Sequence, residues 1–227
     1  MSRSKKTLTK STDRNIPRHL RRLRQTRLKV AAEAARIIAT EGQHNYHAAK
    51  RKAADRIGVS ERLALPSNIE VKDALRDYQS LYGGSAHADN QRRLRLVAVR
   101  AMQLLEQFNP RLVGAVLDGT ANEHSRIALH VFADSPEAVI LFFIEHGELF
   151  AQEQRQIRWF SGEHRTVPLI VFDLEDAVVE LTVFESVHLR QAPPSPIHGK
   201  PQRRATLAEA QLLLLDQQDK RDVQLLR

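Results

Sequence analysis

The hydrophobic periodicity of this chain changes at Asn109-Pro110, and that change limits what the chain can fold into. Before this point, apolar residues recur every three or four positions, as they do on one face of a helix. After it, short runs rich in β-branched and aromatic residues alternate with turn residues, which indicates strands. The 227 residues therefore predict an α+β protein, in which a helical N-terminal part precedes a mixed sheet flanked by helices.

Four helices are expected before Pro110. The first begins at Pro17, a residue favoured in the first helical turn, and ends at a glycine. A capping box, Ser67-x-x-Glu70, opens the third helix, and Gly83-Gly84 ends it. The expected helices cover residues 17–42, 46–57, 67–83 and 92–108.

The second half is expected to hold five strands, one internal helix and a C-terminal helix. Ser135-Pro136 begins the internal helix, which runs to Ile144. A second capping box, Thr206-x-x-Glu209, opens the C-terminal helix after a proline-rich loop. The expected strands cover residues 112–117, 127–132, 157–160, 167–172 and 178–184. The chain is thereby divided into a disordered basic arm (1–16), a helical region (17–87), an α/β domain (88–190), and a loop with a C-terminal helix (191–227).

Positive charge is concentrated at the N-terminus. Residues 1–29 hold eleven Lys or Arg against one acid, whereas the other 198 residues hold 24 basic and 26 acidic ones. Such a segment attracts polyanions by releasing counterions, with little sequence discrimination. We therefore expect a nucleic-acid partner, RNA rather than DNA; a solvated tail and an organelle transit peptide are the alternatives. The expected contacts are Arg18, Arg21, Arg22, Arg24 and Arg27.

Several classes of protein are excluded by composition. No apolar run reaches the ~18–20 residues that a membrane-spanning helix needs, and no apolar segment follows the basic start as in a signal peptide. The chain has no cysteine, so disulfides, thiolate metal sites and a cysteine nucleophile are excluded. These features predict a cytoplasmic protein without membrane contact.

A glycine pattern begins at Gly114, where a helix and a strand lead into a turn and a second strand. Gly119 follows five residues after Gly114, and Ser125 follows eleven after it. This pattern resembles the signature of the polymerase-β-like nucleotidyltransferase superfamily, particularly its small bacterial members. There, Gly-Ser opens the turn, a second Gly and a Ser stand at these spacings, and Asp-hydrophobic-Asp-Leu follows the Ser. The resemblance spans residues 90–185 and implies a third carboxylate on a later strand, a role that Glu180 fits.

The chain departs from the family at the positions that carry its chemistry. In the family, the carboxylates hold two magnesium ions that polarise a triphosphate and activate the attacking hydroxyl. This chain has Arg126 and Ala128 instead of the paired Asp residues, and Ala115 instead of the Ser after the first Gly. A guanidinium ~4 Å from a cation costs about 4 kcal/mol per unit charge at an effective dielectric of ~20. The two-metal site is therefore predicted to be degraded.

Three functions remain open from the sequence. The first is a nucleotide- or RNA-binding protein, because Arg126 can bind phosphate without a metal ion. Its expected phosphate site consists of Gly114, Gly119, Ser125, Arg126 and His130.

The second function is an active nucleotidyltransferase with Glu180 as its catalytic residue. It would need Mg²⁺ held by relocated groups, and His130 is expected to meet Glu180 across the strands. No other cofactor or metal is indicated. The groups available for a relocated metal site are Asp118, Glu123, His124 and Asp134.

The third function is DNA binding by a helix-turn-helix over residues 31–62. Gly58-Val59-Ser60 has the composition of its turn, but Pro66 leaves little room for a recognition helix. The proline-rich loop at residues 193–204 has two interpretations. It either closes over a phosphate ligand or is a solvated connector.

Overall fold

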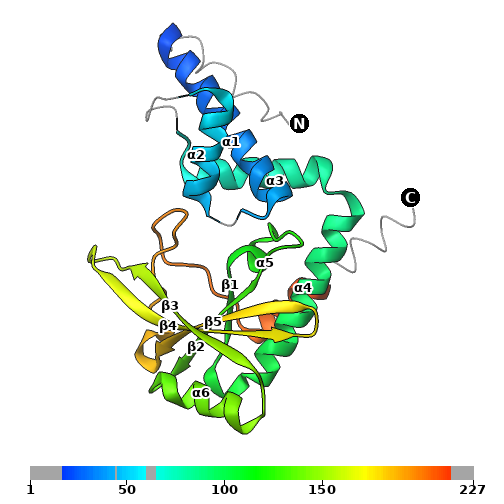
Figure 1. Ribbon diagram of the computed structural model, residues 1–227, viewed down its shortest axis with the longest axis vertical. Coiled ribbons are helices and arrows are strands. Elements are labelled where there is room, and N and C mark those ends of the chain that lie inside the picture. The colour runs from blue at the N-terminus through cyan, green and yellow to red at the C-terminus, as the bar shows by residue number, and fades with distance from the viewer. Residues whose placement is uncertain (1–16, 44, 60–64, 216–227) are drawn as a thin grey trace, which may run out of the picture.

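A computed structural model describes residues 17–43, 45–59 and 65–215 of the chain (Figure 1). Helices form the N-terminal part, and a five-stranded mixed sheet follows. The predicted α+β class is therefore confirmed. The basic arm predicted at residues 1–16 lies outside the described residues.

Three helices form a unit at the N-terminal end, which we call the helical unit. They are α1 (Arg18–Glu41), α2 (Tyr46–Ile57) and α3 (Asn68–Tyr82), as the sequence predicts. Their hydrophobic core is built largely from small residues, including Ala34, Ala35 and Ala49, which let the helices approach closely. The capping box of α3 is present, because Ser67 and Glu70 each accept the other's backbone N–H.

Helix α4 (Gly84–Leu104) connects the helical unit to the sheet. It starts eight residues before the expected position, because the polar segment after Gly84 contains no helix breaker and uses its side chains at the interface. Gln91, for example, is buried and donates from Nε2 to the Ala121 carbonyl at 2.8 Å. The boundary predicted between residues 87 and 88 therefore falls inside one continuous helix. A short 3₁₀ turn, η2 (Glu106–Phe108), follows α4.

The sheet has the strand order β1-β2-β5-β4-β3. Strands β2 and β5 pair in parallel, and the other neighbours are antiparallel. The strands are β1 (Arg111–Val113), β2 (Ile127–Ala133), β3 (Phe150–Arg158), β4 (His164–Leu174) and β5 (Ala177–Glu185).

Alternation along β2 and β5 gives the sheet two different faces. Ile127, Leu129 and Leu181 point into the main core, which they share with α4 and with α6 (Pro136–Glu145). The intervening residues, among them Ala128 and Thr182, point to the opposite face. The helices therefore cover one face, and the other face is left to the loop that follows β5.

Two predicted strands are wrong in extent. The strand expected at 112–117 stops at Val113, because Gly114 has a φ of 73° and turns the chain into the short helix α5 (Gly114–Asp118). Of the strand expected at 157–160, only residues 157 and 158 are in a strand, and they are the end of β3, which is polar and largely exposed along its length. Such a strand lacks the apolar alternation on which the prediction relied.

The chain returns to the sheet after β5. A 3₁₀ turn, η3 (Ser186–Leu189), leads into the proline-rich loop, and Ala205 then forms an isolated bridge to Leu112 of β1. Residues 207–215 are helical. Thr206 and Glu209 form the predicted capping box at the start of this helix, with reciprocal bonds of 2.7 and 3.3 Å.

Candidate functional site

The parallel pairing of β2 with β5 brings the candidate carboxylate positions together. Ala128 lies directly opposite Glu180, and His130 lies opposite Thr182. The side chains at positions 126, 128 and 180 therefore lie close together on the sheet face that the helices do not cover. The expected contact between His130 and Glu180 is not formed, because the strand register places His130 opposite Thr182.

Glu180 is held by two arginines. Its Oε1 accepts from Arg126 Nη1 at 2.9 Å, and its Oε2 accepts from Arg155 Nη2 at 2.6 Å. The Glu180 side chain is only 12 % exposed. Burial by itself raises the pKa of Glu180, but the hydrogen bonds and charges of Arg155 and Arg126 outweigh burial and lower the pKa. The carboxylate is therefore ionised and already neutralised, in an arrangement that repels a metal cation.

The acids considered for a relocated metal site lie apart from one another. Asp118 pairs with Lys72 of α3 at 2.6 Å, and Asp134 accepts from the Ser186 hydroxyl at 2.9 Å. Glu123 is exposed and close to His124. Within the described residues, no group of three or more His, Asp or Glu side chains is placed to hold a metal ion.

The turn that contains Gly119 and Ser125 packs against helices and does not line the cavity described below. Asn122 Nδ2 donates to the Ile38 carbonyl of α1 at 2.7 Å, and Gln79 of α3 donates to the Thr120 carbonyl at 3.0 Å. Among the described residues, the Ser125 hydroxyl forms hydrogen bonds only with Asn122. The turn thus serves as the docking surface for the helical unit, and its two predicted phosphate-binding residues lie within that surface.

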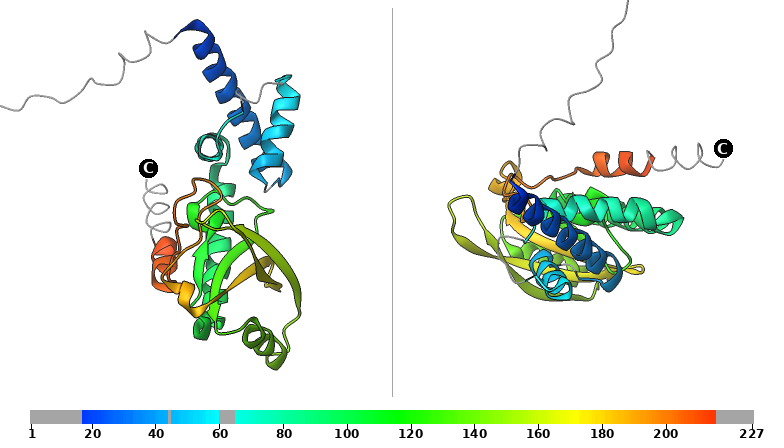
Figure 2. Two further views of the ribbon diagram at one scale, coloured as in Figure 1. Left: turned by 90° about the vertical axis from the view of Figure 1, so that its left-hand side faces the viewer. Right: turned by 90° about the horizontal axis from the view of Figure 1, so that it is seen from above.

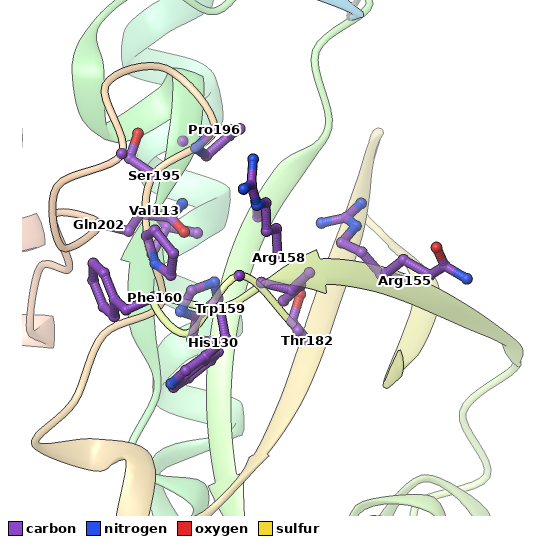
Figure 3. Close-up of a pocket in the computed structure, with 17 residues that line it drawn as sticks. Val113, His130, Arg155, Arg158, Trp159, Phe160, Thr182, Ser195, Pro196 and Gln202 are labelled. Atoms are coloured by element: carbon purple, nitrogen blue, oxygen red, sulfur yellow. The ribbon is translucent and has the colours of Figure 1, made fainter. Parts of the chain in front are cut away.

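A cavity of about 700 Å³ lies on the uncovered face of the sheet, under the proline-rich loop. Gly114 and His130 are the predicted site residues that line it. Figure 3 shows the other contributors, which come from β3, from the turn after it and from the proline-rich loop. The main ones are Arg155, Arg158, Trp159, Phe160, Thr182, Ser195 and Gln202.

The cavity wall is cationic. Arg155 and Arg158 line it, and no Asp or Glu is among its lining residues in the described part of the chain. Arg155 uses one nitrogen on Glu180. The Arg158 side chain is exposed, and its guanidinium makes neither a hydrogen bond nor an ion pair with any other described residue. A guanidinium in this state can bind an oxyanion without first breaking an internal contact.

Aromatic rings line part of the same cavity, and a chain of ring contacts links two of its lining residues, Trp159 and His130. Trp159 makes an edge contact with His188 at 5.2 Å between ring centres, and Phe184 lies 4.8 Å from His130. Phe160, which also lines the cavity, is 55 % exposed. Rings of this kind at a cavity wall can stack on a planar ligand.

His130 is the most buried titratable group in the cavity. It is 4 % exposed, and its Nδ1 accepts from Arg204 Nε at 3.0 Å. Burial, together with the charges of Arg204 and Arg155, lowers the pKa of His130 to about 3. Arg204 is itself fixed over the rings of Phe132 and Phe184 and donates to the His188 carbonyl. His130 is therefore a neutral imidazole with a fixed orientation.

Sequence reasoning missed the contribution of β3 because its strand was misplaced. The signal was present in Arg155-Gln-Ile-Arg-Trp159, where two arginines at a spacing of three precede the only tryptophan of the chain. The sequence allows two interpretations of the proline-rich loop, and in the structure residues of this loop line the cavity. Arg126, by contrast, lies beside the cavity and is tied to Glu180.

The basic surface expected near the N-terminus lies on the first half of α1. Arg18, Arg21, Arg22 and Arg24 are exposed, and no acid occurs between residues 18 and 32. Arg27 is instead paired with Glu70 at 3.0 Å. This half of α1 extends away from the sheet in Figure 1 and in the left view of Figure 2.

The helix-turn-helix expectation falls partly on residues 60–64, which lie outside the described residues. The next helix, α3, has Val71 and Leu75 in the core of the helical unit, and its Lys72 pairs with Asp118 beneath it. Because the hydrophobic core and Asp118 both hold α3, this helix cannot enter a DNA groove unless the helical unit separates from the turn below it.

No protein-family model matches the chain, and no curated protein matches it. Among the described residues, the structure contains no helix with the length and apolar character needed to cross a membrane.

Proposed function

We propose that this protein binds a nucleotide, or a nucleotide unit of RNA, in the cavity under the proline-rich loop and does not transfer it by a two-metal mechanism. The observation that carries the proposal is the composition of the cavity wall. It combines Arg155 and Arg158 with Trp159 and Phe160, and none of its lining residues is acidic. Arginines bind phosphate and aromatic rings stack on bases, so a nucleotide satisfies both parts of the wall.

The size of the cavity supports this ligand class. About 700 Å³ falls within the ~300–1,000 Å³ typical of small-molecule sites. Its floor comes from β2 and β5 and its roof from a loop, so one rigid and one adaptable surface enclose the ligand. Gly114, which lines the cavity, has a φ of 73°, a left-handed conformation that favours glycine at this turn.

The pairing of Glu180 supports binding without metal-dependent transfer. A two-metal site needs several carboxylates free to share cations, whereas Glu180 is taken by Arg126 and Arg155. The resemblance to nucleotidyltransferases is compatible with a nucleotide ligand, and the departures at positions 126 and 128 lie where the metals would be held. The active transferase and the helix-turn-helix regulator have no comparable support among the described residues.

The basic half of α1 extends the proposal to RNA, and we propose a cytoplasmic location as the sequence predicts. An exposed run of arginines without intervening acids is suited to contact a polyanion backbone. In this arrangement the cavity binds one nucleotide, and α1 contributes affinity that depends on salt concentration.

Isothermal titration calorimetry tests the proposal with ATP, UTP and a short oligoribonucleotide, each in Mg²⁺ and in EDTA. We expect nucleotide binding in both buffers. Arg158→Ala should weaken it about ten-fold or more, because a hydrogen bond to a charged group contributes ~1.5–3 kcal/mol. The matched control is Arg190→Ala, which removes an exposed arginine that does not line the cavity. Binding that needs Mg²⁺ and is insensitive to Arg158→Ala contradicts the proposal.

A further inference from the structure

Two polar groups on the cavity floor, His130 Nε2 and the Thr182 hydroxyl, have no hydrogen-bond partner within the described part of the chain. His130 and Thr182 are adjacent across β2 and β5, and both residues are almost completely buried, at 4 % and 2 % exposure. His130 uses only Nδ1, and Thr182 makes no side-chain hydrogen bond with another described residue. Neither His130 Nε2 nor the Thr182 hydroxyl is completely enclosed by protein atoms. Both residues line the cavity, so a ligand in the cavity can reach these two groups.

The hydrogen bond from Arg204 fixes the tautomer of His130. Arginine can only donate, so the Nδ1 that accepts from it carries no proton. The ring proton is therefore on Nε2, which faces the ligand as a donor. Taking up a second proton would break the Arg204 contact and place an imidazolium beside a guanidinium, so the donor remains uncharged when a ligand binds.

The two ends of the cavity differ in chemistry. His130 belongs to the ring chain that includes Phe184, His188 and Trp159. Figure 3 shows Arg155 on the other side of the cavity from His130. There, Arg155 donates to Glu180. An anion is attracted to the arginine side, whereas the floor beside the rings offers a neutral donor and a hydroxyl.

We propose that His130 and Thr182 are specificity-determining residues that bind the edge of a nucleobase, with His130 Nε2–H donating to a carbonyl oxygen or ring nitrogen of the base. The Thr182 hydroxyl bonds the neighbouring atom of the same edge, donating or accepting as the base requires. The phosphate then lies toward Arg155 and Arg158. This inference rests on the proposed nucleotide-binding function, because it assigns the orientation of the ligand in the same cavity.

Two substitutions isolate these contacts. His130→Asn leaves an oxygen near the position of Nδ1, so Arg204 keeps an acceptor while the Nε2 donor is lost. Thr182→Val keeps the shape of the side chain and removes its hydroxyl. Thermal unfolding of both variants checks that the fold is retained, and Thr166→Val, at a threonine of β4 that does not line the cavity, is the matched control.

The experiment measures the affinity of the full chain for AMP, GMP, CMP, UMP, ribose 5-phosphate and pyrophosphate by calorimetry. The wild type is expected to bind at least one nucleoside monophosphate ten-fold or more tightly than ribose 5-phosphate. His130→Asn should reduce that preference by about ten-fold, and Thr182→Val by a few-fold, with little change for ribose 5-phosphate and pyrophosphate.

Each other outcome overturns the inference. Equal binding of nucleotides and ribose 5-phosphate shows that no base is bound, although the phosphate site and the nucleotide proposal survive. A parallel loss of all ligands in His130→Asn shows that His130 holds the phosphate or the cavity shape. Nucleotide affinity unchanged in both variants places the base elsewhere. If no phosphorylated compound binds the wild type, the proposed function itself fails, and this inference fails with it.

Discussion

Glu180 accepts hydrogen bonds from two arginines, at 2.9 Å from Arg126 and 2.6 Å from Arg155. Glu180 lies opposite Ala128 in the pairing of β2 with β5. The side chains at positions 126 and 128 therefore decide whether a cation or an anion is favoured beside Glu180. Two neighbouring carboxylates would add negative charge and invite a metal. The arginines instead leave net positive charge at the edge of the cavity, which favours phosphate.

The charge at this position can be reversed. We expect the double variant Arg126→Asp/Ala128→Asp to bind Mn²⁺ at least ten-fold more tightly than the wild type, because three carboxylates then converge and one opposing guanidinium is gone. Calorimetry with Mn²⁺ measures the change. The matched control, Arg126→Asn/Ala128→Asn, has the same shape without the charge. Equal Mn²⁺ affinity in the Asp and Asn variants would show that these positions do not converge as described.

His130 links the pH of the solution to stability. Its pKa in the folded protein is about 3, below the ordinary value of 6.5. The unfolded chain therefore takes up the proton first as the pH falls. The stability contributed by neutral His130 is complete above pH ~6.5 and is lost progressively toward pH ~3.

Urea unfolding between pH ~7 and ~5 tests this linkage, because the lowered pKa of Glu180 acts only at more acidic pH. Wild-type stability should fall over this interval, and His130→Asn should show a smaller fall. Part of the fall remains in the variant, since burial also lowers the pKa of His87. Equal pH slopes in the two proteins would falsify the neutral state assigned to His130.

At the level of elements, local rules predicted most helices and fewer of the strands. Asn45, Ser67 and Thr206 satisfy backbone groups within three residues of themselves, so these helix starts are visible in the sequence. Strand β3 is different. Its nine residues are mostly exposed, and they form a strand because β4 pairs with them. That pairing joins two separate strands, and no local sequence pattern predicts it. The strand formed in this way carries both arginines of the cavity.

Helix α1 combines two functions in one element. Its second half supplies Val30, Ala34 and Ile37 to the core of the helical unit, whereas its first half carries exposed arginines. The core therefore holds the helix at one end only, and the basic half extends into solvent (Figure 2).

We expect four substitutions in α1 to reduce the salt dependence of RNA binding. Replacing Arg18, Arg21, Arg22 and Arg24 with Gln should lower the slope of log affinity against log salt by up to roughly 3, since each contact with single-stranded RNA contributes ~0.7. Fluorescence anisotropy with an oligoribonucleotide at several salt concentrations measures the slope. The same four positions changed to Lys keep the charge and serve as the control. An unchanged slope in the Gln variant would remove α1 from the RNA contact.

For the whole molecule, the helical unit and the cavity are joined through the turn at residues 118–125 and through the loop. The turn bonds to α1, α3 and α4, which fixes the unit over the sheet. The glycine spacing predicts a phosphate-binding turn here. Glycine spacing indicates only the backbone conformation of a turn, and it does not indicate which elements pack against the turn. Its position between two cores depends on helices more than forty residues away, such as α3 with Gln79.

Asn68 is the direct link between the helical unit and the cavity loop. Its Nδ2 donates to the Pro196 carbonyl at 2.8 Å, and its Oδ1 accepts from Lys50 Nζ at 2.7 Å. Helices α2 and α3 therefore hold the loop that forms the roof of the cavity. Asn68→Ala should weaken nucleotide binding several-fold, because the ligand must then supply the part of the loop's ordering that Asn68 provides.

The same substitution should change the free energy of unfolding by only ~1 kcal/mol, since a partly exposed hydrogen bond contributes little net stability. Hydrogen exchange adds a second measurement, because the amides of Ser195 and Gly199 are bonded within the loop. Both should exchange faster in Asn68→Ala and recover when nucleotide is added. Asn90→Ala, which removes an amide on α4 that bonds Arg93 away from the loop, is the control. Unchanged exchange and affinity would mean that the loop holds its position without the helical unit.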